Sequence, residues 1–149
     1  MTNEIRRKLQ IILDMDDAQK EVHGRDGYYP LIMYLSQVGI RDKEFGDFIL
    51  DVTKLFVCSH KEYSDKERLY FAHVTNEFYE EESFRKVMRG GDNPRFVRKT
   101  LFRINQLDKY PIEYLLIYIE GLISCDDEIT TNELKLYNTI LNMLSKKED

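Results

Sequence analysis

Apolar side chains recur at helical spacing along most of the chain. The clearest pattern follows Asp42, a predicted helix N-cap, and repeats at the i, i+3, i+4 and i+7 intervals of one helix face: Phe45, Phe48, Ile49, Val52, Leu55 and Phe56. Residues 4–20 and 131–145 show the same spacing. Since no stretch alternates apolar and polar residues with the period of two that marks a strand, the pattern predicts an all-α fold.

Turn and capping residues divide this pattern into separate helices. The sequence G-R-D-G at residues 24–27 is expected to end the first helix. Asn93 followed by Pro94 is typical of a helix start, where the missing proline N–H is harmless. A further helix is expected from residue 65 to residue 82, ending in an acidic cluster. Together the segments predict one helical bundle of about six to seven helices.

Residues 108–123 differ from the other segments because they are apolar on nearly every face. A helix of this kind is buried all round, so we expect it to lie at the centre of the bundle. The length predicts a single domain over residues 1–149. Within it we expect an N-terminal helical extension over residues 1–40 and a repeated helical core over residues 44–146.

The chain contains an internal repeat. When the sequence is shifted by 66 residues, residues 48–67 align with residues 114–133 and their apolar positions coincide. Both segments also contain a capping box, in which a hydroxyl and a carboxylate three residues apart bond backbone N–H groups at a helix start. The two boxes are Ser64 with Glu67 and Thr130 with Glu133. The repeat predicts two pseudo-repeated α-hairpins, each with an apolar helix, a polar turn and an amphipathic helix.

The second turn reads S-C-D-D-E-I-T-T-N-E at residues 124–133 and has the acids of a calcium loop. An EF-hand loop needs an oxygen ligand at position 1, glycine at position 6 and glutamate at position 12. With Glu133 at position 12, Leu122 takes position 1 and Asp127 takes position 6. The turn is therefore not an EF-hand. Its capping box explains Glu133 and leaves the three acids before Ile129 to be explained.

An acidic turn of this kind between two helices resembles the tellurite-resistance TerB-like family. Its motif is roughly D-G-x-[IV]-[ST]-x-x-E and occurs twice in an all-helical domain. Residues 126–133 match the motif, except that Asp127 replaces the glycine. The first turn keeps Glu62, Ser64 and Glu67, but His60 and Lys61 stand where acids or glycine are expected. The resemblance covers about residues 44–146.

The resemblance to the TerB-like family implies a compact helical bundle without established catalytic chemistry. Members occur in stress- and phage-related systems and as modules of larger proteins. Some bind a divalent metal ion through clustered acids near these turns, and no other cofactor is implied. Carried over to this chain, the metal-binding residues would be Asp126, Asp127, Glu128 and Glu133, with Glu62 and Glu67 from the first turn. Lys61 opposes a metal there, and the alternative is that the acids stabilise helix N-termini.

The most distinctive surface feature is a basic segment at residues 85–103, in a chain whose net charge is −5. Against one acid it carries Arg85, Lys86, Arg89, Arg95, Arg98, Lys99 and Arg103. With the backbone amides of Gly90 and Gly91, these cations indicate a site for phosphate, nucleic acid or an acidic protein surface. The alternative is internal pairing with Glu77, Glu80, Glu81 and Glu82. A pI of about 5.3 argues against a dedicated nucleic-acid-binding protein, so a protein partner is expected first and nucleic acid second.

Catalytic and membrane-spanning patterns are missing from the sequence. It has no Walker loop, no G-x-S-x-G and no H-E-x-x-H, so we do not expect an enzyme. No apolar run reaches 18 residues, and two cysteines do not make a disulfide framework, so we expect a cytoplasmic protein without a membrane partner. An alternative is a zinc site whose ligands are Cys58, His60, His73 and Cys125, although their spacing lacks the paired ligands of a specific zinc motif.

These observations predict a non-catalytic binding or regulatory module that recognises a macromolecular partner through the basic helix at residues 94–106. The alternative is an acidic helical inhibitor or immunity-type protein. Such a protein would neutralise a basic enzyme, such as a nuclease, through the acids at residues 77–82 or those of the second turn.

Overall fold

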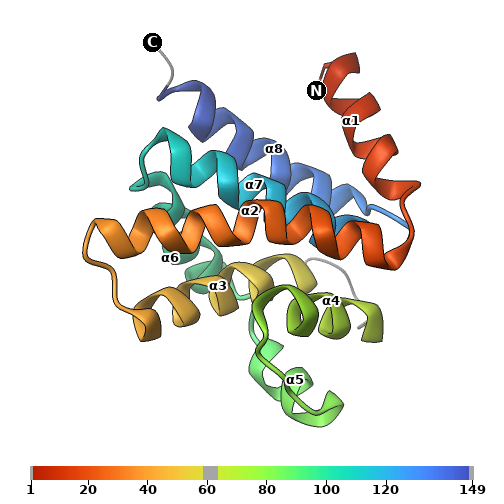
Figure 1. Cartoon of the computed structure of the whole chain (residues 1–149), viewed down its shortest axis with the longest axis horizontal. Coiled ribbons are helices and arrows are strands. Elements are labelled where there is room, and N and C mark those ends of the chain that lie inside the picture. The colour runs from red at the N-terminus through yellow and green to blue at the C-terminus, as the bar shows by residue number, and fades with distance from the viewer. Residues whose placement is uncertain (1, 59–63, 148–149) are drawn as a thin grey trace.

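The structure is all-helical. This computed structural model describes residues 2–58 and 64–147, which form eight helices and no strand (Figure 1). In chain order they are α1 (Asn3–Leu13), α2 (Asp17–Gln37), α3 (Asp42–Val57), α4 (Asp65–Thr75), α5 (Glu81–Met88), α6 (Pro94–Asn105), α7 (Lys109–Ser124) and α8 (Thr131–Ser145). The predicted all-α class is confirmed. Among the described residues, no helix combines the length and the apolar character needed to span a membrane.

The centre of the fold is α7, which packs against α1, α2, α3, α4 and α8. Its apolar side chains are buried on almost every face of the helix. The central position predicted from its composition is therefore confirmed. The most extensive of these contacts is with α2, and Figure 1 shows α2 lying across α7.

Gly27 allows α2 to approach α7 closely. A Cβ atom on Gly27 would stand 2.4 Å from the carbonyl oxygen of Tyr114 and 2.9 Å from the backbone nitrogen of Tyr118. Both of these atoms belong to the α7 backbone, which cannot move aside as a flexible side chain can. Any larger residue at position 27 would therefore force the two helices apart.

Tyr70 of α4 packs between α2 and α7 and forms a hydrogen bond to the α7 backbone. Its buried hydroxyl donates a hydrogen bond of 2.6 Å to the carbonyl oxygen of Tyr118. The same hydroxyl would lie 2.1 Å from a Cβ on Gly24 of α2 and 2.4 Å from a Cβ on Gly121 of α7. The tyrosine reaches the α7 backbone only because both helices carry glycine at this point.

The prediction that residues 24–27 end the first helix is wrong. α2 is helical from Asp17 to Gln37, and both glycines and Pro30 lie inside it. Glycine costs a helix interior about 1 kcal/mol relative to alanine, but close packing of one buried helix on another returns more than that. The inner face of α2, which includes the buried Leu31 and Leu35, lies in the core.

The first break in the chain lies before residue 20, so the predicted helix at residues 4–20 is two helices. α1 ends at Leu13, and α2 starts after Asp16. The Asp16 carboxylate accepts a hydrogen bond of 2.8 Å from the Gln19 N–H, and the Gln19 side chain accepts one of 2.9 Å from the Asp16 N–H. This reciprocal capping box starts a new helix where the apolar spacing alone suggests continuation.

The predicted helix at residues 65–82 also ends early. α4 stops at Thr75, and Asn76 takes the left-handed conformation with φ 63°. Asparagine tolerates this conformation better than most residues and commonly ends a helix. The acidic cluster then begins α5 at Glu81 instead of ending α4, in the position where acids favour the helix dipole.

Two predicted helix starts are close to the structure. Asn93 caps α6 by accepting hydrogen bonds from the N–H groups of Arg95 and Phe96, and Pro94 is the first helical residue, as predicted. Asp42 is the first residue of α3, whose N-cap is Arg41. That prediction is wrong by one residue.

Both predicted capping boxes are present, at the starts of α4 and α8. The two hairpins that they suggested are not confirmed as matching units. α7 and α8 pack against each other, whereas α4 packs mainly against α2, with smaller contacts to α5 and α7. The feature that is repeated is the capped helix start, but the two capped helices pack against different neighbours.

The glycine contact between α2 and α7 predicts opposite effects for two glycine-to-alanine substitutions. Gly27→Ala should lower the free energy of unfolding by about 1–3 kcal/mol, because the methyl group meets the α7 backbone. Gly46→Ala in α3 meets no atom within 4 Å and should raise the free energy of unfolding by about 0.5–1 kcal/mol. Urea unfolding of the two variants measures both values. Equal effects of the same sign would contradict the close contact.

Candidate functional site

The second acidic turn is tied to α2 and α4 by ion pairs. Asp127 accepts hydrogen bonds from the Lys20 ammonium at 2.8 Å and from the Lys66 ammonium at 3.0 Å. The hydrogen bond from Lys20 is the largest cause that lowers the pKa of Asp127 to about 2. Lys20 is only 1% exposed, and a buried ammonium group needs a hydrogen-bond partner such as this carboxylate. The turn therefore joins three parts of the chain through one carboxylate.

Asp127 also adopts a backbone conformation that few residues take. Its φ is 66°, in the left-handed region that glycine enters without strain and aspartate tolerates. This is the position at which the TerB-like motif has glycine. The side chain at this position then supplies the carboxylate that the two lysines share.

The other acids predicted for a metal site are spread over different roles. Glu67 and Glu133 are each 1% exposed, and each accepts a hydrogen bond from the N–H of its own N-cap residue, at 3.1 and 2.8 Å. Asp126 is half-buried, Glu128 is exposed, and Glu62 lies outside the described residues. Among residues 2–58 and 64–147, no three or more His, Cys, Asp or Glu side chains are grouped to hold a metal ion. The described residues thus add no support for the metal prediction.

Among the described zinc candidates, Cys58 lies apart from Cys125 and His73. The Cys58 thiol donates to the Met88 carbonyl oxygen beside Gly91. Cys125 and His73 line a cavity of about 170 Å³ between α2 and α4, together with Lys20 and Lys66. Burial raises the pKa of the Cys125 thiol well above its usual value. His60 lies outside the described residues.

Two cations of the basic segment are paired within the chain, one of them with Glu81, an acid that the internal-pairing alternative names, and the other with Asp51, which it does not. Arg103 of α6 donates a hydrogen bond of 2.7 Å to Asp51 of α3, and its guanidinium lies 5.2 Å from the centre of the Phe48 ring. Arg85 pairs with Glu81 at 2.9 Å, one turn away on α5. Arg103 thus joins α6 to α3, whereas the Arg85 pair lies within α5, and both arginines are less available to a partner.

The other five cations of the segment are exposed: Lys86, Arg89, Arg95, Arg98 and Lys99. None of them forms an ion pair with an acid in the described part of the chain. On α6, three of them share one face with Phe102, which is 65% exposed. We call this face the basic stripe: Arg95, Arg98, Lys99 and Phe102.

Several backbone amides near the basic stripe are bonded within the chain, including that of Gly91 from the predicted anion site. The N–H of Gly91 donates to the Met88 carbonyl, and the N–H of Val97 donates to the Asn93 carbonyl. The Asn93 side chain accepts hydrogen bonds from the N–H groups of Arg95 and Phe96. These amides are already bonded, so recognition here would rest on side chains.

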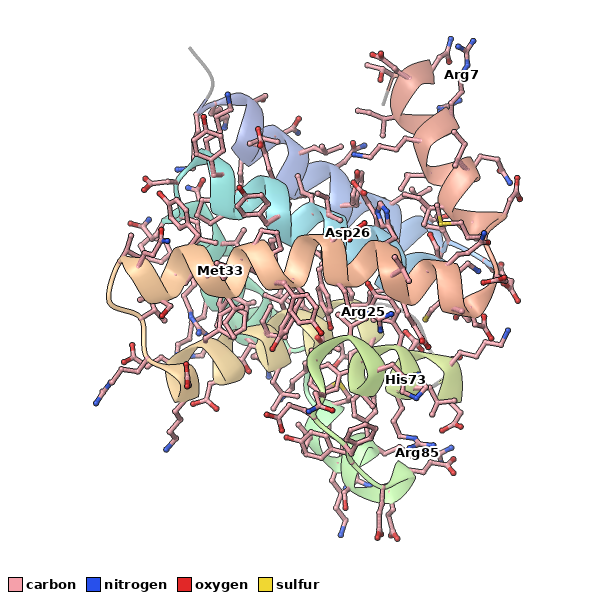
Figure 2. The ribbon with its side chains drawn as sticks, in the orientation of Figure 1. Arg7, Arg25, Asp26, Met33, His73 and Arg85 are labelled. Carbon is pink, nitrogen blue, oxygen red and sulfur yellow. The ribbon has the colours of Figure 1, made fainter. Side chains whose placement is uncertain are left out.

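The sequence analysis missed a buried polar cluster around Glu120 of α7. This carboxylate has no exposed surface, yet three side chains from three helices reach it. Tyr137 of α8 donates a hydrogen bond of 2.6 Å, His23 of α2 lies at 3.0 Å, and Lys8 of α1 forms an ion pair at 3.0 Å. Figure 2 shows the helices that contribute these side chains, with Arg7 labelled on α1 and Asp26 on α2.

The Glu120 cluster contains a buried negative charge to which side chains of three other helices bind. Burial alone would raise the pKa of Glu120, but the bonds from His23 and Tyr137 and the charge of Lys8 outweigh burial and lower it. The cluster therefore joins α1, α2 and α8 to the central helix. The signal in the sequence was an acid between Ile119 and Gly121 in the most apolar part of a helix, which must find partners when it is buried.

Comparisons with protein-family models, with curated proteins and with solved structures found no match to this chain.

The ion pairs of Asp127 predict a pH-dependent loss of stability in Asp127→Asn. Asparagine also tolerates the left-handed backbone, so the substitution removes the charge and keeps the turn. A folded-state pKa of about 2 lies below the ordinary value of 3.8, so the stabilisation is complete above pH 3.8 and is lost as the pH falls toward 2. Urea unfolding should show a less stable variant at neutral pH and a vanishing difference near pH 2. A difference that does not depend on pH would contradict the ion-pair account.

The Glu120 cluster predicts that Lys8→Met loosens α1 selectively. α1 loses its ion pair to the core, while His23 and Tyr137 still satisfy Glu120. Hydrogen exchange of the α1 amides should become faster while α7 stays protected. Lys135→Met is the matched control, because Lys135 is exposed and forms no ion pair among the described residues. Equal effects of the two variants on α1 would contradict the attachment role.

Proposed function

We propose that this chain is a TerB-like, non-catalytic binding or regulatory module that recognises an acidic surface of another protein through the basic stripe of α6. The supporting observation is that the cations of the stripe have no acid partner in the described residues, in a chain with 27 acids. Unpaired arginines beside an exposed aromatic ring are the composition of an interface centre. The stripe is therefore the best-supported binding surface.

A protein fits this surface better than nucleic acid does. The stripe covers one face of a helix of 12 residues, and the chain as a whole carries a net charge of −5. A nucleic acid would bring further phosphates toward that acidic surface, where they are repelled. A protein with a local acidic patch meets only the stripe. Phe102 adds apolar contact that phosphate groups would not use.

The TerB-like part of the proposal rests on the acidic turn. Its capped helix start and the left-handed backbone at Asp127 are the features that the family motif requires of this turn. In this proposal Lys20 and Lys66 take the place of a metal ion in neutralising Asp127. The proposal also includes a stress- or phage-related setting, which the resemblance alone suggests.

A second candidate function is favoured by the segment between α4 and α5. Phe78 is 69% exposed there, next to the exposed acids Glu77 and Glu80. An aromatic ring among acids would suit an inhibitor that binds a basic enzyme, such as a nuclease. The two functions use different surfaces, so one experiment separates them.

Site-specific photo-crosslinking in cells that express the protein tests both surfaces. A photoreactive amino acid at position 102 should form an adduct with one acidic protein, because that position lies in the basic stripe. Arg95→Glu with Arg98→Glu should abolish the adduct. Arg7→Glu with Lys43→Glu changes the net charge equally at exposed sites on α1 and α3 and should leave the adduct unchanged.

The outcomes of the crosslinking experiment are distinct. An unchanged adduct in a folded Arg95→Glu and Arg98→Glu variant would contradict the stripe, and an adduct with nucleic acid would contradict the proposed partner class. Crosslinking to a basic enzyme from position 78, with none from position 102, would establish the inhibitor function instead.

A further inference from the structure

A cavity of about 170 Å³ lies between α2 and α4. Its charged residues recur at helical spacing, so one face of each helix supplies them: Asp17, Lys20 and Glu21 of α2, and Lys66 and His73 of α4. Figure 2 shows α4 beneath α2 at this point, with His73 labelled. An engineered protein cavity of about 150 Å³ binds benzene, so this space suits a ligand of about six non-hydrogen atoms.

Two ion pairs join α2 to α4 along this cavity. Glu21 and His73 are in contact, with 2.7 Å between a carboxylate oxygen and a ring nitrogen. A carboxylate oxygen of Asp17 and the Lys66 ammonium lie 3.8 Å apart, which is beyond hydrogen-bond distance. The second pair therefore leaves hydrogen-bonding capacity at Lys66 for a group of another molecule.

Lys20 brings unsatisfied hydrogen-bond donors to the cavity. Its side chain is 1% exposed, and an ammonium group has three N–H donors. Among the described residues, its one acceptor is Asp127, at 2.8 Å. Lys66 likewise donates to Asp127 alone, at 3.0 Å. Donors that are removed from water need acceptors, and the cavity is the open space beside both lysines. This wall of the cavity therefore suits the carboxylate of a ligand.

Glu21 brings the opposite charge to the same cavity. Its side chain is 20% exposed, and its Oε2 atom bonds the Nδ1 atom of His73. Its second oxygen has no hydrogen-bond donor in the part of the chain that the structure describes. A half-buried carboxylate oxygen of this kind suits an ammonium group. The cavity thus offers donors at Lys20 and an acceptor at Glu21, which are neighbours in the chain.

We propose that this cavity binds a free α-amino acid with a small side chain. The carboxylate of the ligand accepts hydrogen bonds from Lys20 and Lys66, and its ammonium group donates to Glu21. An α-amino acid carries these two charges on one carbon, which matches the closeness of the two groups on α2. Leu69 and Tyr70 form an apolar part of the lining, against which the side chain of the ligand packs.

The charges of the cavity select a zwitterion over an ion of a single sign. Asp17 and Glu21 repel a simple anion, and Lys20 and Lys66 repel a simple cation. A ligand that carries both charges meets a partner for each of them, which is the basis of discrimination against the other two classes. Alanine has six non-hydrogen atoms and therefore also matches the size of the cavity.

The amino-acid site goes beyond the proposed function and does not depend on it. α6 packs against α3 and α8, so the basic stripe belongs to a different part of the fold from the cavity between α2 and α4. Failure of the partner experiment would leave the amino-acid site unaffected, and a chain that binds no amino acid would leave the basic stripe unaffected.

Isothermal titration calorimetry of the full chain tests the site with glycine, L-alanine and L-serine, each at millimolar concentration. At least one of the three should bind. Two fragments of L-alanine serve as controls, propionate without the ammonium group and ethylamine without the carboxylate. Each fragment should bind about tenfold more weakly or worse, because it loses a hydrogen bond to a charged group. Absence of binding by all three amino acids would overturn the proposal, as would propionate binding as tightly as L-alanine.

Two substitutions test the assigned contacts. Lys20→Met removes the buried ammonium group, and Glu21→Gln removes the negative charge while an amide oxygen can still bond His73. Each should weaken binding of the amino acid about tenfold or more. Glu82→Gln and Lys86→Met make the same changes at exposed positions of α5 and should leave binding unchanged. Wild-type affinity in a folded Glu21→Gln variant would overturn the proposal, and this variant decides the test if Lys20→Met does not fold.

Discussion

The close contact between α2 and α7 is the constraint on which the rest of the structure depends. Gly27 brings the two backbones together, and Gly24 with Gly121 admits the Tyr70 hydroxyl between them. Because that hydroxyl bonds the α7 backbone, α4 is placed by the same contact. The position of α2 then decides which of its side chains complete the core and which are exposed to solvent. The local cost of glycine in a helix is thus offset by tertiary packing.

Charged groups attach the outer parts of the chain to this centre. Glu120 binds side chains from α1, α2 and α8, and Asp127 joins the second turn to Lys20 and Lys66. Buried charges are tolerated only where partners satisfy them, so each cluster fixes a single arrangement of the helices around it. The basic stripe differs from these clusters, because its cations form no ion pair with an acid among the described residues. The buried charges are thus paired within the fold, whereas the exposed cations of the basic stripe are the ones available to an acidic partner.

The sequence predicted the all-α class, the central helix and both capping boxes, because apolar periodicity and capping chemistry are local signals. It failed at residues 24–27, where the glycines serve a contact with a helix far along the chain. The Glu120 cluster was missed for the same reason, since its partners come from three other helices. The basic segment was found, but the pairing of Arg103 with Asp51 needed the fold. Features set by neighbouring residues could be predicted from the sequence, whereas contacts between residues distant in the sequence could not.

Native-state hydrogen exchange of the backbone amides at residues 24–31 tests the central contact most directly. If α2 is a continuous helix clamped onto α7, these amides should exchange only on global unfolding, with the same free energy as the slowest amides of α7. Exchange at residues 24–27 as fast as in an exposed loop would show that the glycines interrupt the helix. That result would contradict the close contact between α2 and α7.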